Sequence, residues 1–583
     1  MSVLLNKQIP LFKHCALQCT KNGIRRIFSV TGTWPKHLEN EHLHAIEEKW
    51  KDVVPNEVKK AQATLSEPVR TRYVLSMFPY PSGQLHMGHV RVYAISDAMA
   101  HYHRFMKHKV IHPMGWDAFG LPAENAAIER QIQPQVWTET NIASMKEQLQ
   151  SLCCLFDWER EIATCDPNYY RWTQWFFLQM LKHGLAYQKN AMVNWDPVDQ
   201  TVLADEQVDE AGRSWRSGAL VERKPLKQWF LRTTRFSKDL YEGLDDPSLQ
   251  NWQEVIKLQK HWIGECNGIR VDFKLTNGED FVTAWTDKPE LLEQATFVGL
   301  SPGHILDRKD LQLKRVRSEN HDVTTLNVCA VNPLNGLPIP ILVLNNSNAN
   351  APEAELWYAN SDPTAKEIAI LCNVCNDVKD ARPLSTEEVT RRLVELNAGG
   401  FWCSSKLNDW LISRQRYWGT PIPIVHCPTC GAVPVKESDL PVVLPVLNQL
   451  SAKGVSPLVC AKDWLNTPCP SCGSPAKRET DTMDTFVDSS WYFARYLDPK
   501  NTEEAFSKKA SEHLPVDLYI GGKEHAIMHM YFARFFTHFM HYIDLSPTKE
   551  PFQNLLVQGM VKVRLQCSSN LPHYHAVYFV LTG

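Results

Sequence analysis

Apolar residues recur along this chain at several spacings, and each spacing predicts a different kind of element. Leu43, Ile46 and Trp50 lie on one face of a helix, so a polar helix is predicted over residues 41–65. Apolar and aromatic residues are dense from residue 135 to 190, which predicts a helical region. The chain therefore starts with helical segments of two kinds, one polar and one rich in aromatic side chains.

Residues 72–112 alternate between strand and helix patterns. A β-rich run over 72–78 is followed by the breaker Pro79–Gly83, a helical stretch over 88–106 and a short strand over 110–112. Strand, loop, helix and strand in this order predict a parallel α/β sheet.

Short β-like runs replace the helical pattern between residues 268 and 400. The clearest runs cover residues 269–275, 281–286 and 339–344, with polar loops between them. Helix and strand patterns return over residues 484–562. The middle stretch is therefore predicted to be a β-rich domain inserted into an α/β domain.

The amino terminus has its own charge pattern. No Asp or Glu occurs before Glu39, while basic residues are spread through the segment: Lys7, Lys13, Lys21, Arg25, Arg26 and Lys36. Basic, acid-free and amphipathic sequence is typical of a mitochondrial transit peptide, which we predict over residues 1–40, with the matrix as destination. A solvated basic tail is the alternative.

Composition limits the remaining possibilities. In 583 residues, 44% are hydrophobic, 22% are charged and the net charge is −3, so the chain can bury large cores. The charge balance shows no global basic excess, so any nucleic-acid binding must come from local patches. No uncharged apolar run reaches the ~18 residues of a membrane span, so no membrane insertion is expected.

Two cysteine pairs have the spacing of a metal site. Cys427 and Cys430 form one CxxC pair, Cys469 and Cys472 form the other, and a glycine follows each pair. Each pair presents two thiolates on a tight turn, and four thiolates satisfy tetrahedral zinc with no position left for water. We therefore predict one structural zinc ion in a module over residues 427–478; redox pairs are the alternative.

His86 and His89 flank Gly88 where the loop meets the predicted helix. Residues three apart share a helical face, and the free N–H groups of a helix N-terminus favour phosphate. Gly88 allows close approach of a nucleotide to the backbone. A half metal site and chance are alternatives that this motif alone leaves open.

Longer runs identify the family that these residues resemble. Phe78-Pro-Tyr-Pro-Ser-Gly-Gln-Leu-His-Met-Gly-His-Val-Arg is similar to the "HIGH" signature of class I aminoacyl-tRNA synthetases in its leucyl form. Five further family motifs follow in order, beginning at Gly115, Asn194, Trp410, Asp484 and Tyr519. The resemblance extends from about Tyr73 to Lys562, and the isoleucyl and valyl enzymes match less well at Phe78–Tyr80 and Asp484–Tyr492.

The resemblance implies a fold, a reaction and roles for residues. The fold is a Rossmann-like parallel sheet with an inserted editing-type domain and a small zinc module. The reaction is activation of leucine with ATP, as its magnesium complex, followed by transfer to tRNA(Leu) by a protein that we expect to be a monomer. The catalytic residues are His86 and His89, and ATP would bind at His86, Gly88, His89, Gly521, Gly522, Glu524 and His525. Leucine would bind at Met77, Phe78, Tyr80, Asp117, Phe486, Ser489, Tyr492, His525 and His529.

The chain departs from the family pattern in two places. The editing motifs are replaced by Thr283–Glu290 and Ala351–Ala365, in which Asp362 is the nearest candidate for the editing acid, so weak editing is expected. After Lys562 the lysine-rich "KMSKS" loop and the anticodon-region helices of the family do not follow. We therefore expect weak or no ligase activity from this chain; a non-catalytic leucine- or tRNA-binding fragment is the alternative.

The predicted domains follow from these patterns. They are listed in order along the chain: a transit peptide, 1–40; the first part of the catalytic domain, 41–267; a degenerate editing-type domain, 268–400; catalytic sequence, 401–426; the zinc module, 427–478; the last catalytic part, 479–562; and a tail without family pattern, 563–583.

Overall fold

A computed structural model describes most of the chain. The described residues are 40–65, 70–209, 211–278, 281–346, 353–374, 384–447, 456–522, 525–559, 562–567 and 577–582. The predicted transit peptide thus lies outside the described residues, except for its last position. No helix in the described part of the chain has both the length and the apolar character needed to cross a bilayer.

The chain divides into two compact units. The smaller unit runs to Arg70 and includes Lys146–Leu155, and the larger unit comprises Thr71–Met145 and Phe156–Gly583. The smaller unit contains α2 (Asn40–Trp50) and α3 (Val53–Ala63). The single helix predicted over residues 41–65 is therefore two helices.

A four-stranded parallel sheet forms the centre of the larger unit. Its strands, in spatial order, are β2 (Lys109–Ile111), β1 (Thr71–Ser76), β21 (Leu518–Gly522) and β22 (Leu555–Gln558). Helix α4 (Met87–Phe105) connects β1 to β2. This arrangement confirms the predicted strand–helix–strand order, and it places Val74 opposite Leu518 on neighbouring strands, 444 positions apart in the chain.

The two faces of this sheet belong to different cores. Val74 and Ile520 pack on Ala100 of α4, while Tyr73 and Tyr519 point into the main hydrophobic core. That core surrounds α16 (His529–Tyr542) and α7 (Pro167–Lys182), both of which are largely buried. Alternation along β1 and β21 thus places one face of each strand beside α16.

The region from residue 135 to 190 is less helical than predicted. It contains α6 (Pro134–Ser151) and α7, but residues 152–166 hold only a 3-10 turn, and a strand begins at Ala186. This strand, β3 (Ala186–Asp196), pairs with β5 (Glu222–Leu231) along ten residue pairs. We call this pair of strands the ribbon; β4 (Thr201–Leu203) and β14 (Trp410–Leu411) flank it.

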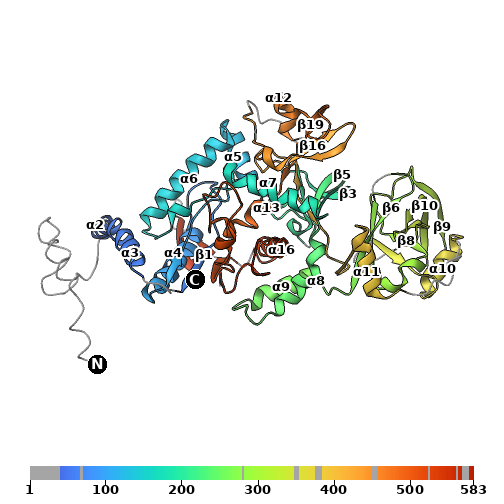
Figure 1. The fold of residues 1–583 in the computed structure, drawn as a ribbon, viewed down its shortest axis with the longest axis horizontal. Coiled ribbons are helices and arrows are strands. Elements are labelled where there is room, and N and C mark those ends of the chain that lie inside the picture. The colour runs from blue at the N-terminus through green and yellow to red at the C-terminus, as the bar shows by residue number, and fades with distance from the viewer. Residues whose placement is uncertain are drawn as a thin grey trace, which may run out of the picture. The chain divides into compact units, whose positions relative to one another are not determined.

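The insertion forms an eight-stranded mixed sheet. Its strands are β13 (Gly399–Cys403), β6 (Gly268–Leu275), β7 (Phe281–Thr286), β12 (Ala354–Trp357), β8 (Phe297–Leu300), β11 (Pro338–Leu344), β10 (Asp322–Val331) and β9 (Gln312–Arg317). A further pairing of β6 with β10 folds the sheet back on itself around a separate core. The β-rich prediction is confirmed, but the two helices beside the sheet, α10 (Pro363–Leu371) and α11 (Thr386–Glu395), were not predicted (Figure 1).

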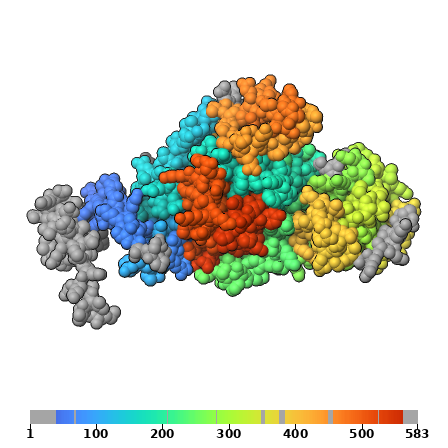
Figure 2. All heavy atoms as spheres, in the orientation of Figure 1, coloured from blue at the N-terminus to red at the C-terminus, as the bar shows by residue number. Residues whose placement is uncertain are grey.

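The cysteine-rich region forms a small four-stranded sheet. Its strands are β17 (Gly431–Pro434), β16 (Ile424–Cys427), β19 (Pro475–Arg478) and β18 (Asn466–Pro468). The orange surface in Figure 2 shows that this sheet lies at the exterior of the molecule.

Shorter elements complete the described fold. They are α5 (Leu121–Arg130), α8 (Ser237–Glu242), α9 (Gln253–Ile263), α12 (Lys462–Leu465), α13 (Thr485–Ser489), α14 (Tyr492–Arg495), α15 (Lys508–Ser511), β15 (Ser413–Arg414), β20 (Thr482–Met483), β23 (Lys562–Cys567) and β24 (Val577–Thr582).

Candidate active site

Sequence motifs that are far apart along the chain meet at the carboxyl end of the parallel sheet. The Arg414 guanidinium is paired with the Asp484 carboxylate and also donates to Gln207 Oε1 over 3.0 Å. The backbone N–H of Trp418 donates to Glu124 Oε2 over 2.8 Å. These buried bonds lock three of the motifs, those that begin at Gly115, Trp410 and Asp484, into one arrangement.

A small cavity of about 30 Å³ lies where β1, β21 and α16 come together. Eight of its nine lining residues are those predicted to bind leucine; the full lining is Met77, Phe78, Tyr80, Asp117, Phe486, Ser489, Tyr519, His525 and His529. The ninth predicted residue, Tyr492, lies behind the wall and stacks on Phe78 with ring centroids 3.9 Å apart. This volume holds a water molecule or two, so a larger ligand requires side chains to move.

Asp117 is the only acidic residue among the described residues that line this cavity. Burial raises its pKa well above the usual value, and the neighbouring Asp488 carboxyl raises it further, while hydrogen bonds from Tyr80 and Thr164 oppose the shift. Burial raises the pKa of Asp488 itself to about 7. The cavity therefore holds a carboxyl group that gains from a cationic partner.

A chain of hydrogen bonds forms the inner end of the cavity. The Tyr492 hydroxyl lies 3.0 Å from the Tyr519 hydroxyl, which lies 2.7 Å from His529 Nε2. Burial lowers the pKa of His529 to about 3, with a contribution from His525, so its ring is neutral at pH 7. Tyr519 was missed in the sequence, although alternation along β21 puts it on the same face as Gly521.

His525 and His529 reach the cavity from different local structures. Helix α16 begins at His529, whereas His525 lies in a short 3-10 turn before it. The two histidines therefore do not share one helical face, although their rings are 6.3 Å apart and border the same cavity.

A larger cavity of about 590 Å³ adjoins the small one at the N-terminus of α4. It is lined by His86, Gly88, His89, Gly521, Gly522 and His525 among others, and it shares Met77, Phe78, Tyr80 and His525 with the small cavity. Glu524 lies outside the described residues. Gln558 was not predicted; it lines this cavity, and both of its amide atoms are buried with no hydrogen-bond partner among the described residues.

The two histidines at this helix end bond to each other's backbone. His86 Nδ1 accepts from the N–H groups of Gly88 at 3.1 Å and His89 at 3.4 Å, and His89 Nδ1 accepts from the His86 N–H at 3.3 Å. In the neutral rings this leaves the proton on Nε2 as a free donor. Burial and then His86 lower the pKa of His89 to about 4, so His89 is neutral at pH 7.

Two expectations about this helix end need correction. Because His86 caps the helix, the N–H groups of Gly88 and His89 are not free for phosphate. A side chain at Gly88 would meet the His86 ring at 2.9 Å, and one at Gly521 would overlap Met77 Sδ. The absence of a side chain at these two positions thus makes room for the neighbouring side chains of His86 and Met77, before any nucleotide is considered.

The four paired cysteines converge in the small sheet. Their Sγ atoms lie within 4.8 Å of one another. Gly431 and Gly473, which follow the pairs, both have φ of 75°. Tetrahedral zinc with bonds of ~2.3 Å separates its sulfur ligands by ~3.8 Å, so the cluster fits a metal of this kind.

Asp362 caps a helix in the insertion. Its carboxylate accepts from the N–H groups of Thr364 at 2.8 Å and Ala365 at 3.2 Å, at the start of α10. The nearby Tyr358 is buried, and its hydroxyl lies 2.7 Å from Thr286 Oγ1. The candidate editing acid is therefore already engaged by the backbone.

Family models match three regions of the chain. Residues 72–214 match "tRNA synthetases class I (M)", residues 400–564 match "tRNA synthetases class I (I, L, M and V)", and residues 260–347 match "Leucyl-tRNA synthetase, editing domain". Together with the parallel sheet and the two adjoining cavities, these matches define a class I aminoacyl-tRNA synthetase.

Individual relatives narrow this class. The chain is 46% identical to a probable mitochondrial leucine–tRNA ligase of Mus musculus, covering 92% of this chain and 62% of that protein. It is also 46% identical to the leucine–tRNA ligase of Crocosphaera subtropica, covering 90% of this chain and 68% of that one. The chain belongs to the leucyl-tRNA synthetase family.

A solved structure agrees with this assignment. The ternary complex of Agrobacterium radiobacter K84 agnB2 LeuRS, tRNA and LeuAMS is similar with a TM-score of 0.66 and 35% identity. The similarity covers 88% of this chain and 67% of that one. In the comparison with the mouse relative, this chain spans about 62% of that protein's length.

Proposed function

We propose that this chain carries the activation site of a leucine–tRNA ligase, which forms leucyl-adenylate from leucine and ATP and transfers leucine to tRNA(Leu). The observation that carries the proposal is the pair of adjoining cavities that share Met77, Phe78, Tyr80 and His525. One cavity combines the apolar side chains of Met77, Phe78 and Phe486 with the Asp117 carboxyl group, and the other lies at a helix end with two imidazole donors. An aliphatic amino acid and a nucleotide fit these two chemistries.

In this proposal leucine enters the small cavity and ATP the large one. The Asp117 carboxylate binds the leucine ammonium, while Phe78, Phe486 and Tyr80 enclose the side chain. The Nε2–H groups of His86 and His89 donate to the ATP phosphates, where they stabilise charge that develops on the leaving pyrophosphate.

Gln558 extends the proposed nucleotide site. Its unpartnered amide donates to and accepts from the sugar or base of the nucleotide, beside the backbone of Gly521 and Gly522. Glu524 remains a proposed ribose contact from the family resemblance alone.

The test is leucine binding by calorimetry, together with leucine-dependent exchange of pyrophosphate into ATP. Leucine is expected to bind more tightly than valine, by about 1–3 kcal/mol for the one methylene that separates them. Equal binding of leucine, valine and glycine would contradict the proposal. Leucine binding without any exchange would favour the second candidate, a non-catalytic leucine- or tRNA-binding fragment.

We also propose the domain boundaries given above and a structural zinc ion bound by Cys427, Cys430, Cys469 and Cys472. The ion would hold two turns of a small sheet together and would take no part in the reaction. The ion's identity is supported by four thiolate ligands in a compact cluster, which suit zinc.

Import into mitochondria, with the matrix as the final location, is proposed from the acid-free basic segment before Glu39 and from the names of the relatives. The test is a fluorescent reporter fused to residues 1–50. Mitochondrial fluorescence is expected, and it should be lost when the six basic residues of the segment are changed to Gln. A cytosolic reporter would refute the proposal.

A further inference from the structure

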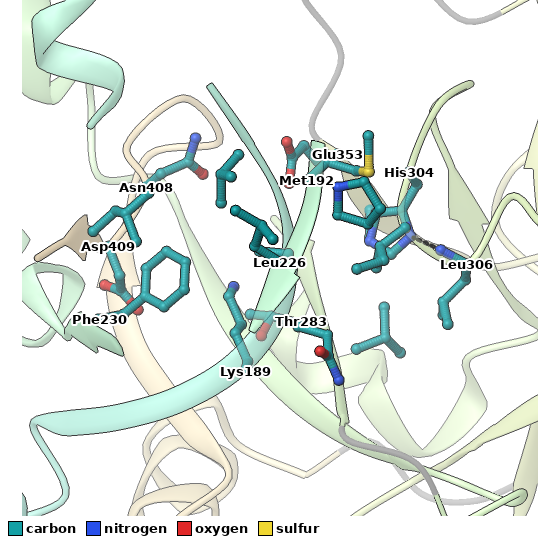
Figure 3. A pocket seen from close by; sticks show the side chains of 18 of the residues that line it. Lys189, Met192, Leu226, Phe230, Thr283, His304, Leu306, Glu353, Asn408 and Asp409 are labelled. Carbon is teal, nitrogen blue, oxygen red and sulfur yellow. Dashed lines mark hydrogen bonds between the residues drawn. The ribbon is translucent and has the colours of Figure 1, made fainter. Parts of the chain in front are cut away.

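A second large cavity lies away from the active site, between the ribbon and the insertion. Its volume is about 630 Å³, within the ~300–1,000 Å³ range of small-molecule sites. Strands β3 and β5 form one wall, and β6, β7 and the loop at His304–Leu306 form the other (Figure 3). None of the residues proposed above for leucine or ATP lines it. We call it the ribbon cavity.

Among the described residues that line it, basic side chains outnumber acidic ones. The basic residues are Lys189, Arg223, Lys227, Arg270 and Arg308, and the acidic ones are Asp205, Glu353 and Asp409. Each of these carboxylates already has a partner. Asp205 and Asp409 accept hydrogen bonds from neutral polar side chains, and Glu353 is paired with Arg223. The cavity is therefore better suited to an anion than to a cation.

Lys189 is the central cation of the ribbon cavity. Figure 3 shows its side chain extending into the cavity, with Phe230 on one side and Thr283 on the other. Its ammonium lies 5.0 Å from the Phe230 ring centroid, and the structure records no ion pair for it within the described chain. Burial lowers its pKa, although Asp409 and Glu353 oppose the shift. A buried ammonium without a direct counter-ion gains from an anionic ligand.

Two further donors face the same space. Arg270 Nε is buried with no hydrogen-bond partner in the described part of the chain, while the Nη2 atom of the same side chain donates to the Ser405 carbonyl over 3.2 Å. His304 Nδ1 accepts from the Leu306 N–H at 3.2 Å, and burial lowers the pKa of His304 to about 4. The neutral ring therefore carries its proton on Nε2, as a donor.

The remaining wall of the cavity is apolar. Met192, Leu226, Phe230 and Leu306 line it, and Figure 3 shows Leu226 and Phe230 beside Lys189. A flat ring packs against such side chains, and Asn408 beside them offers both a donor and an acceptor. Cationic side chains and N–H donors next to an apolar wall match a ligand that has an anionic group at one end and a ring at the other.

We propose that the ribbon cavity binds a nucleoside monophosphate, with its phosphate at Lys189, Arg270 and His304 and its base against Leu226 and Phe230. The ligand would contact the ribbon and the insertion at once. It would thereby hold together two parts of the larger unit that are joined beside the cavity by the Arg232–Asp272 ion pair at 2.9 Å.

The experiment is calorimetric titration of the whole chain with AMP while a non-hydrolysable leucyl-adenylate analogue saturates the active site. One AMP per chain is expected to bind, and Lys189→Met is expected to weaken binding about tenfold or more, because a charged hydrogen bond is lost. The matched control is Lys224→Met, which changes a lysine of the same ribbon that does not line the cavity. This control should bind AMP within twofold of the unmodified protein.

Two further measurements keep the outcome clear. Ribose 5-phosphate should bind at least tenfold more weakly than AMP, because it lacks the ring. In the unmodified protein, AMP should shift the methyl resonance of Met192, which lines the cavity, and leave that of the buried Met180 unchanged. This measurement locates AMP in the ribbon cavity without using the Lys189→Met variant, so a folding defect in that variant cannot mimic the result. No AMP binding beyond the saturated active site, equal binding of ribose 5-phosphate, or no effect of Lys189→Met would each overturn the proposal.

Discussion

Replacing Asp117 by Asn should weaken leucine binding strongly. The side chain is 2% exposed, and in the proposed complex its carboxylate pairs with the leucine ammonium in a buried site. Removing one partner of a buried charge pair costs about 3–5 kcal/mol. Since ~1.4 kcal/mol corresponds to a tenfold change, the dissociation constant for leucine should rise by about 10²–10³-fold or more.

The same carboxyl group predicts how binding depends on pH. Burial raises the pKa of Asp117 in the free protein, so below that raised pKa the group must lose a proton before it pairs with the ammonium. Leucine affinity should therefore rise with pH up to the raised pKa, by about tenfold per unit, and then level off. Asp117→Asn should give a flat profile.

A stability measurement separates this explanation from simple damage to the fold. A carboxyl group whose pKa is raised on folding destabilises the native state at pH values above its unfolded pKa. Asp117→Asn should therefore melt at a higher temperature than the unmodified protein when no ligand is present, and it should lose the stabilisation that leucine confers.

Asp488→Asn is the matched control. Asp488 also raises the pKa of Asp117, but it does not line the small cavity. This variant should bind leucine and should shift the pH profile to lower pH. A flat profile for the unmodified protein, together with less than a fivefold effect of Asp117→Asn, would refute the reasoning.

Three further predictions concern the rest of the molecule. Metal analysis should find about one zinc per chain, reduced in Cys430→Ser but not in Cys460→Ser, which changes an exposed cysteine outside the cluster; a metal-free protein whose melting is unaffected by chelators would contradict this. Hydrolysis of isoleucyl- or norvalyl-tRNA should remain near background, because Asp362 caps α10 and Tyr358 bonds to Thr286, and fast hydrolysis that disappears in Asp362→Ala would show a working editing site. Arg534→Met should lower the free energy of unfolding in urea by about 3–5 kcal/mol, because it leaves Glu550 buried without the arginine that contacts it at 2.6 Å; the double variant Arg534→Met/Glu550→Leu should recover most of the loss.

Local sequence pattern predicted those elements whose boundaries are marked by loop residues. Strand β7 covers residues 281–286 as predicted, because a polar turn precedes it and Pro289 follows. The pattern failed at residues 184–190, where Ala186–Asn190 form a strand only because β5 pairs alongside. Long-range pairing of this kind leaves little trace in a single segment.

In the candidate active site, too, residues in local motifs were predicted and those brought in by long-range contacts were not. Met77, Phe78 and Asp117 belong to long motifs, and the structure brings them to one cavity as predicted. Tyr519 was noted only as the first residue of a family motif, and the structure places its hydroxyl between Tyr492 and His529. The ribbon cavity was not predicted, because its residues come from segments more than 200 positions apart.

The walls shared by the two cavities of the active site have a thermodynamic consequence. Met77, Phe78, Tyr80 and His525 each face both spaces, and the small space must enlarge before an amino acid enters. Any rearrangement of these side chains that one ligand stabilises changes the free energy with which the other binds. Linkage requires this change to be equal in both directions, so whatever factor ATP contributes to leucine affinity, leucine contributes to ATP affinity. In the proposed function, substrate order is thus a matter of rates, while any mutual gain in affinity depends on the four side chains that line both cavities.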